Sequence, residues 1–257
     1  MFILLYILLL IIGIAVGAIT GITGSSGVVV VVPVLSYMGI NFKTDIGTSL
    51  LVDVITTTIV IYVYLKKKTL HVIMGLLLGA GALVGAQIGA NIADIVPVFP
   101  LEIVFTIMMA YMAYYTINKS YHMNKVMKHI KLNSNFALFV GFLLAIPVGI
   151  LTGIIGASGG VLFIFIIILL FTMDAQNMVG TATLAMFISA SSGAFGYYRI
   201  GHIYYVAAIL IGIVALGSGY YFSILAHKLD QKYIYRFLGV IFVLVVVSEL
   251  FRIAVLR

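Results

Sequence analysis

The stretch GAITGITGSSG, residues 17–27, returns 132 residues later as GILTGIIGASG, residues 149–159. Seven of the eleven positions are identical, and the four glycines of the first block recur at the same places in the second. With one residue inserted, the correspondence continues through Gly47-Thr48 with Gly180-Thr181, Tyr64 with Tyr197, and Gly79 with Gly212. A matching block followed by collinear matches indicates that the chain contains two related halves.

The composition places both halves in a lipid bilayer. Of 257 residues, 64% are hydrophobic and 8% are charged, and the mean hydropathy is +1.28. A soluble domain carries about 25% charged residues, because its surface faces water. The net charge of +7 comes from basic residues between apolar runs, which act as topology signals, so we expect no nucleic-acid partner. The absence of Cys excludes disulfides and thiolate metal sites.

Apolar runs alternate with polar or turn residues along the whole chain. We expect ten segments, at about 1–22, 27–40, 46–65, 70–93, 97–117, 135–155, 159–173, 178–198, 203–226 and 233–256. Most of them reach the ~20 residues that cross ~30 Å of hydrocarbon. The second segment of each half is short and follows a glycine-rich break. Small residues three or four apart on two segments also predict closely crossed helices; they are Gly81, Gly85 and Gly89, and Ala208, Gly212, Ala215 and Gly219.

Five segments in each half make an odd number of passages, so the second half enters the membrane in the opposite sense. Inverted-topology repeats are typical of secondary transporters, whose substrate site lies between the repeats near the bilayer midplane. The sequence therefore predicts an all-α polytopic membrane protein with a first transmembrane repeat at 1–117, a basic linker at 118–134 and a second repeat at 135–257.

Basic residues are distributed unevenly between the two sets of loops. One set holds Lys66, Lys67, Lys68, Lys119, Lys125, Lys128, Lys131, Lys228 and Lys232, and the other holds Lys43, Arg199, Arg252 and Arg257. Loops rich in Lys and Arg stay in the cytoplasm. We therefore expect a multi-pass protein of the cell membrane with a cytoplasmic linker and both termini outside. The sequence specifies no oligomeric state.

The two glycine-rich breaks are the first candidates for a substrate site. Non-helical backbone at membrane depth occurs only where protein or a water-filled cavity satisfies its amides. Such amides, together with the positive ends of half-helices, suit an anion. The alternative is that the glycines only allow close helix packing. The candidate residues are Gly24, Ser25, Ser26 and Gly27 in the first break, and Gly156, Ser158 and Gly159 in the second.

Hydroxyl side chains open the segment that follows each short one. Thr48 and Ser49 in the first half, and Thr181 and Thr183 in the second, could line the same cavity. They could equally bond to a carbonyl one turn back, as hydroxyls often do in apolar helices.

Asp53 lies well inside the segment 46–65. An ionisable group there costs about 2.5–3.5 kcal/mol on insertion scales, so it usually faces a cavity and marks function. Asp53 is a candidate to carry a coupling proton; the alternative is a structural hydrogen bond to Ser or Thr. Its partner in the other half is Met186.

The paired G-x-x-x-G-x-x-G-x-S-G blocks, Val32-Pro33, the two Gly-Thr pairs and the basic turn Lys66–Lys68 resemble the sulfite exporter TauE/SafE family. The resemblance extends over essentially the whole chain. It implies a transporter of sulfur-containing anions such as sulfite, sulfoacetate or related organosulfonates. The chain departs from the family's run of three glycines, with Ser26-Gly27-Val28 and Ser158-Gly159-Gly160, and Phe165 stands where the first half has Pro33.

The leading hypothesis is therefore a secondary transporter of a small anion, with proton coupling as an option and no catalytic residue. The chain has no G-x-x-x-x-G-K-[ST] loop and no His and carboxylate residues at metal-ligand spacing, so we expect neither a cofactor nor a bound metal. One alternative is a passive channel or a structural membrane subunit. Another is an intramembrane serine protease, because residues 156–160 fit G-x-S-x-G; that motif needs a base near the serine, and His202 and His227 stand at segment ends.

Overall fold

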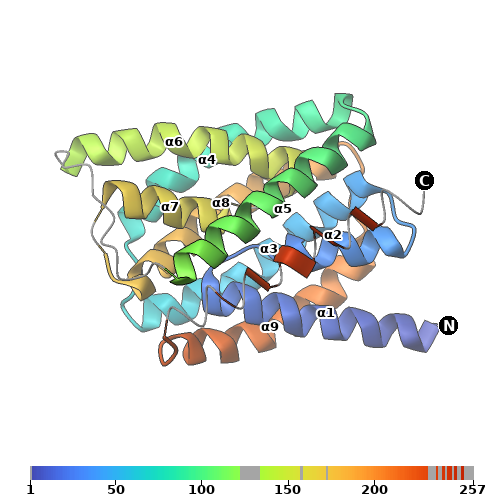
Figure 1. The fold of residues 1–257 in the computed structure, drawn as a ribbon, viewed down its shortest axis with the longest axis horizontal. Coiled ribbons are helices and arrows are strands. Elements are labelled where there is room, and N and C mark those ends of the chain that lie inside the picture. The colour runs from blue at the N-terminus through green and yellow to red at the C-terminus, as the bar shows by residue number, and fades with distance from the viewer. Residues whose placement is uncertain are drawn as a thin grey trace.

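The computed structural model shows a bundle of helices lying roughly along one direction (Figure 1). The described residues are 2–121, 134–156, 159–171 and 173–230, with residues 236, 239, 240, 242–244, 246, 247, 250 and 251 of the tenth segment. Within them the helices are α1 (Phe2–Thr23), α2 (Val28–Tyr37), α3 (Phe42–Lys66), α4 (Val72–Ile95), α5 (Val98–Tyr121), α6 (Ser134–Ile155), α7 (Gly160–Leu170), α8 (Ala175–Arg199) and α9 (Tyr205–Ala226).

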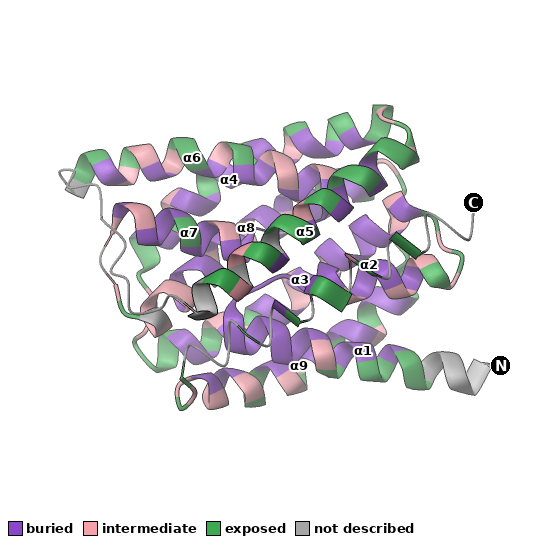
Figure 2. Ribbon diagram, in the orientation of Figure 1, coloured by how far each residue is buried: buried purple, intermediate pink, exposed green. Residues whose placement is uncertain are grey.

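Six of the described helices have the length and hydropathy to cross a bilayer, namely α3, α4, α5, α6, α8 and α9. Large hydrophobic side chains are exposed along the outer faces of the bundle, for example Ile73, Ile107 and Ile213, while the middle of the bundle is buried (Figure 2). An apolar exterior is what a surrounding of lipid requires. The prediction of an all-α polytopic membrane protein is confirmed.

Loops from different parts of the chain meet at the two ends of the bundle. At one end the backbone N–H of His71, in the α3–α4 connection, donates to Thr181 Oγ1 over 3.0 Å near the start of α8. At the other end the backbone N–H of Tyr204, in the α8–α9 connection, donates to Thr48 Oγ1 over 2.9 Å near the start of α3. Helices α3 and α8 therefore begin at opposite ends of the bundle.

The pairs α1–α2 and α6–α7 are hairpins that return toward the end from which they start (Figure 1). Helix α2 leads into the start of α3, and α7 leads into the start of α8. The two hairpins consequently enter the bundle from opposite ends, as an inverted repeat requires. With 10 and 11 residues, α2 and α7 are return arms and not separate crossings, which need about 20 residues.

The helix contacts of one half are matched by those of the other. Helix α1 packs on α9 as α6 packs on α4, α9 packs on α3 as α4 packs on α8, and α2 packs on α3 as α7 packs on α8. The hydroxyl of Tyr64 donates to the Gly21 carbonyl over 3.3 Å, and the hydroxyl of its counterpart Tyr197 donates to the Gly153 carbonyl over 3.0 Å. Equivalent residues thus make equivalent bonds across a pseudo-two-fold relation.

Small residues bring the paired helices into backbone contact, as the four-residue spacing predicted. A Cβ built on Gly85 of α4 would lie 2.1 Å from the carbonyl oxygen of Ile146 in α6. In the equivalent pair, a Cβ on Gly17 of α1 would lie 2.6 Å from the backbone nitrogen of Gly219 in α9. Each hairpin therefore has its long arm packed on the fourth helix of the opposite half.

Some helix bounds differ from those expected from the sequence. Helix α3 begins at Phe42, four residues early, because the side chain of Asn41 caps it by accepting from the backbone N–H of Lys43 over 2.9 Å. Helix α5 continues to Tyr121, so the first residues assigned to the linker are helical. Residues 122–133, which hold most of the linker, lie outside the described residues, as does most of segment 233–256.

Two glycines at equivalent positions leave no room for a side chain. A Cβ on Gly47 would lie 2.0 Å from the His202 carbonyl oxygen, and one on Gly180 would lie 2.2 Å from that of Thr69. We expect Gly47→Ala and Gly180→Ala each to lower the free energy of unfolding by about 1–3 kcal/mol, because overpacking is relieved only by moving backbone. Thermal unfolding of the purified protein measures the change. Gly217→Ala is the control, since nothing lies within 4 Å of a Cβ there; an equal loss in that variant would contradict the packing explanation.

Candidate functional site

The first break begins where α1 ends, at Thr23. Gly24 has a φ of +63°, in the left-handed region that glycine adopts most readily, and its N–H still donates to the Thr20 carbonyl over 2.9 Å. The hydroxyl of Thr23 then accepts from the backbone N–H of Ser25 over 3.1 Å. The backbone amides of Gly24 and Ser25 therefore both have hydrogen-bond partners within the end of α1.

Asp53 of α3 supports the same break from the side. Its Oδ1 accepts from the backbone N–H of Gly27 over 2.8 Å, and its Oδ2 bonds to the hydroxyl of Ser26. The Ser26 oxygen in turn accepts from the backbone N–H of Val28 over 3.1 Å. The side chain of Asp53 is fully buried. Asp53 thus makes the hydrogen bond to serine that was the structural alternative for it, and it does so at the break that is the candidate site.

The second break has a different internal structure. Gly156 has a φ of +73° and Gly159 a φ of +82°, and the carbonyl of Gly159 accepts from the N–H of Phe163 in the first turn of α7 over 2.8 Å. Ser158 lies outside the described residues. Met186, the counterpart of Asp53, places its sulfur 3.0 Å from a Cβ built on Gly160. A thioether therefore stands beside the second break where a carboxylate stands beside the first.

The two breaks touch each other in the interior of the bundle. A Cβ built on Gly160 would lie 1.8 Å from the carbonyl oxygen of Gly24, so only a glycine allows this approach. Each break also rests on the third helix of the other half: Gly24 lies against Thr183 of α8, and Gly156 lies against Ile46 of α3. The structure thus brings together Gly24–Gly27 with Gly156 and Gly159.

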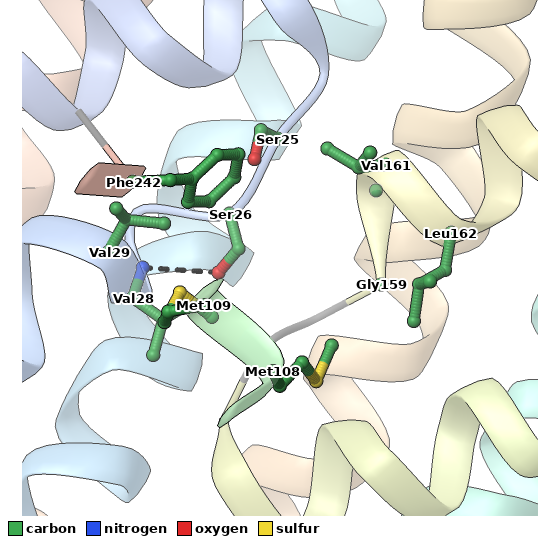
Figure 3. Close-up of a pocket in the computed structure, with 11 residues that line it drawn as sticks. Ser25, Ser26, Val28, Val29, Met108, Met109, Gly159, Val161, Leu162 and Phe242 are labelled. Atoms are coloured by element: carbon green, nitrogen blue, oxygen red, sulfur yellow. Dashed lines mark hydrogen bonds between the residues drawn. The ribbon is translucent and has the colours of Figure 1, made fainter. Parts of the chain in front are cut away.

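A small cavity lies between the breaks, and the space in it that is open to the centre of a water-sized sphere is about 20 Å³. It is lined by Ser25, Ser26, Val28, Val29, Met108, Met109, Gly159, Gly160, Val161, Leu162 and Phe242. In Figure 3 the two serines and Val29 occupy one side of it, and Gly159, Val161 and Leu162 the other. The first turns of α2 and α7 both contribute to the wall. The N-termini of two half-helices therefore meet at one cavity.

The hydroxyls at the starts of α3 and α8 have other partners. Thr48 and Thr181 accept from the loop amides at the two ends of the bundle, and neither lines the cavity between the breaks. Thr183 donates to the Val179 carbonyl over 2.7 Å and packs against Gly24. Ser49 is buried and its hydroxyl has no partner among the described residues. Of these four, Thr183 is the one that the structure places against Gly24 of the first break.

Several residues of the site carried no signal in the sequence. Met108 and Met109 of α5, and Phe242 of the tenth segment, close the cavity but resemble any core residue of an apolar helix. Asp45 is a second buried carboxylate of α3, but it does not line the cavity and accepts from the hydroxyl of Ser36 near the end of α2.

The histidines that a serine protease would need as a base lie away from the cavity. His202 sits 3.2 Å from the Thr44 hydroxyl at one end of the bundle, and His227 sits 3.1 Å from the Thr69 hydroxyl at the other. Neither histidine lines the cavity. Within the described part of the chain no three acidic or histidine side chains gather in a way that could hold a metal ion.

The chain is similar to proteins that are named as probable membrane transporters. The chain is 25% identical to the probable membrane transporter protein YunE of Bacillus subtilis (strain 168), over 93% of this chain and 95% of that protein. It is 26% identical to the probable membrane transporter protein MJ0441 of Methanocaldococcus jannaschii, over 90% and 88%. No solved structure matches it. The family model "Sulfite exporter TauE/SafE" matches residues 9–248, and because that is most of the chain, this protein belongs to the sulfite exporter TauE/SafE family of membrane proteins.

Proposed function

We propose that this protein is a secondary transporter that carries a small anion, a sulfur-containing oxyanion or an organosulfonate, by alternating access. The observation that carries the proposal is the meeting of the two helix breaks at one cavity between the halves. The substrate class is proposed from the family, whose name refers to sulfite export, and from the two serines and two helix N-termini in a cavity wall that is otherwise apolar.

Two helix N-termini give the cavity wall its preference for negative charge. The first N–H groups of an α-helix have no partner within the helix, and the helix dipole adds the equivalent of about half a positive charge there. Val28 and Val29 of α2, and Gly160, Val161 and Leu162 of α7, bring such first turns to the cavity. None of the described residues that line it is basic. The anion is therefore held by backbone dipoles and hydroxyls.

The organisation in two halves supplies the route for alternating access. We propose that residues 1–117 and 135–257 form inverted repeats joined by the basic linker 118–134, with the linker in the cytoplasm and both termini outside. The hairpins enter from opposite ends (Figure 1), so each closes the cavity toward a different side of the membrane. Asp53, which bonds to the first break, is the candidate for proton coupling.

Transport by the purified protein in proteoliposomes tests the proposal. The panel comprises sulfite, thiosulfate, sulfate, methanesulfonate, sulfoacetate and simple carboxylates, and we expect saturable counterflow of at least one sulfur-containing anion. Gly160→Val should lower this flux by about tenfold or more, because its side chain collides with Gly24, and losses of that size follow from small misplacements at a site. Gly217→Ala should leave the flux unchanged.

Other results of the panel would point away from this function. Movement of an uncharged solute without any anion would remove the anion assignment. Anion flux that neither saturates nor shows counterflow would make the protein a channel.

Engineered cysteines test whether the two breaks share a cavity in the membrane. The chain has no native Cys, so a double variant reports only the introduced pair. Ser25→Cys with Val161→Cys, both at the cavity wall, should be joined by a short thiol cross-linker. Ser25→Cys with Ile107→Cys should not, because Ile107 is 64% exposed on the outer side of α5. Equal cross-linking of the two pairs would contradict a shared cavity.

The proposed orientation is tested by labelling from one side of intact cells. Lys67 lies in the turn after α3 and Lys43 lies at the start of α3; each is replaced by Cys in a separate variant. A membrane-impermeant maleimide should label Lys43→Cys in intact cells, and Lys67→Cys only after the cells are opened, because the basic turn stays in the cytoplasm. The reverse pattern would invert the assignment.

A further inference from the structure

Ser26 stands between the buried carboxylate of Asp53 and the cavity. Its hydroxyl oxygen bonds to Asp53 Oδ2 and accepts from the backbone N–H of Val28 over 3.1 Å, while the residue itself is part of the cavity wall (Figure 3). The second oxygen of Asp53 is held by the N–H of Gly27 over 2.8 Å. The carboxylate cannot turn away from Ser26 without losing the Gly27 bond.

The protonation state of Asp53 decides which part of the Ser26 hydroxyl faces the cavity. A serine hydroxyl has one hydrogen to donate and two lone pairs to accept with. The N–H of Val28 occupies one lone pair. When Asp53 is ionised it can only accept, so it takes the Ser26 hydrogen and the remaining lone pair is left for the cavity. When Asp53 is protonated, its O–H donates to that lone pair, and the Ser26 hydrogen is left for the cavity.

We propose that Asp53 and Ser26 form a proton-operated hydrogen-bond switch, which lets the cavity bind an anion only together with a proton. A proton from solution adds to Asp53 Oδ2; the hydroxyl proton stays on Ser26 and turns from Asp53 to the anion. In the ionised state an anion would meet a lone pair with a carboxylate behind it, and both repel it. This inference deepens the proposed function and depends on it for the anion.

The asymmetry between the halves sets the stoichiometry of the switch. Met186 occupies the place of Asp53 beside the second break, and a thioether takes up no proton near neutral pH. With one such carboxylate–serine pair among the described residues of the two breaks, we expect one proton for each anion bound. A monovalent anion then moves without net charge.

The other ionisable groups on the helices around α3 lie outside the cavity wall, and several have hydrogen-bond partners elsewhere. The hydroxyls of Tyr64 and Tyr197 bond to the carbonyls of Gly21 and Gly153, and Asp45 bonds to Ser36. Glu102 is the buried acid of α5. The remaining ionisable groups whose side chains the structure describes on these helices are Tyr37 of α2, Lys43, Tyr62 and Lys66 of α3, Tyr111, Tyr114 and Tyr115 of α5, Tyr198 and Arg199 of α8, and Tyr205, Tyr220 and Tyr221 of α9. None of these groups lines the cavity.

Proton uptake on anion binding tests the switch in the unaltered protein. The purified full chain is titrated with methanesulfonate, and separately with sulfite, in weakly buffered solution on the alkaline side of neutrality. Methanesulfonate is the anion of a strong acid, so it does not itself take up protons. Binding and protonation are reciprocally linked, and we expect one proton to be taken up per methanesulfonate bound. Its affinity should fall by about tenfold per pH unit once Asp53 is ionised in the free protein.

The variant Asp53→Asn imitates the protonated state. The Asn amide nitrogen can donate to Ser26 and its oxygen can accept from Gly27, so the Ser26 hydrogen faces the cavity at every pH. We expect Asp53→Asn to bind methanesulfonate with an affinity that no longer changes with pH and without proton uptake. In proteoliposomes it should keep counterflow and lose accumulation driven by a pH gradient.

Serine variants separate the switch from a general effect on the cavity. Ser26→Ala should weaken methanesulfonate binding at acidic pH by about tenfold or more, as expected for a lost hydrogen bond to a charged group, and should abolish proton uptake. Ser25→Ala also changes the cavity wall but does not touch the bonds of Asp53, so it should retain one proton per anion. Ser223→Ala removes a buried hydroxyl of α9 that bonds to Gly219 and should change neither quantity.

The outcomes distinguish the two proposals. If neither methanesulfonate nor sulfite binds or is transported, the anion assignment falls, and the switch with it. If either binds without proton uptake, or if Ser26→Ala retains one proton per anion, the switch is wrong while the transporter proposal stands.

Discussion

A polypeptide amide at membrane depth must find a hydrogen-bond partner, and that requirement governs the centre of this protein. A continuous helix satisfies its amides internally, whereas a broken one exposes them at a cost of several kcal/mol for each unsatisfied group. Both breaks here lie deep in the bundle, with the αL glycines Gly24 and Gly156 buried. In the first break, side-chain oxygens, including the Asp53 carboxylate, accept hydrogen bonds from the free backbone amides. Both breaks are also packed closely against the opposite half. The breaks are tolerable because they are packed against each other.

The repeat explains how far the fold could be predicted. Identical glycines at 17–27 and 149–159 predicted two halves and two breaks, and the spacing of small residues predicted that α4 and α9 pack closely on neighbouring helices, without naming those neighbours. The hairpin character of α1–α2 and α6–α7 was not predictable from the sequence, because a short apolar segment can also cross a bilayer that is locally thinned. The sequence predicted the start of α3 four residues too late. The reason is local, because the sequence does not distinguish the capping residue Asn41 from an ordinary loop residue.

The site was predictable where chemistry is local and unpredictable where it depends on packing. Ser25 and Ser26 were identified by position within a break, and Asp53 by its depth in an apolar segment. Thr48 and Thr181 occupy matching positions and were candidates to line the cavity, but each accepts a hydrogen bond from a loop amide of the opposite half. Which amide lies next to a hydroxyl at the start of a helix depends on the tertiary fold. Met109 and Phe242 come from the last helix of each half, and no pattern in an apolar stretch marks which side chain will reach the centre.

The helix pairs also constrain how a transporter with this fold can open. The long arm of each hairpin is locked by glycine contacts to the fourth helix of the other half, α1 to α9 and α6 to α4. Sliding across such an interface would drive backbone into backbone, since a Cβ on Gly149 would already lie 2.1 Å from the Ala82 carbonyl oxygen. Each pair must therefore move as a unit. The two breaks are joined to different units, so in the proposed alternating-access cycle a rotation of one pair against the other would separate Gly24 from Gly160 and change the access to the cavity between them.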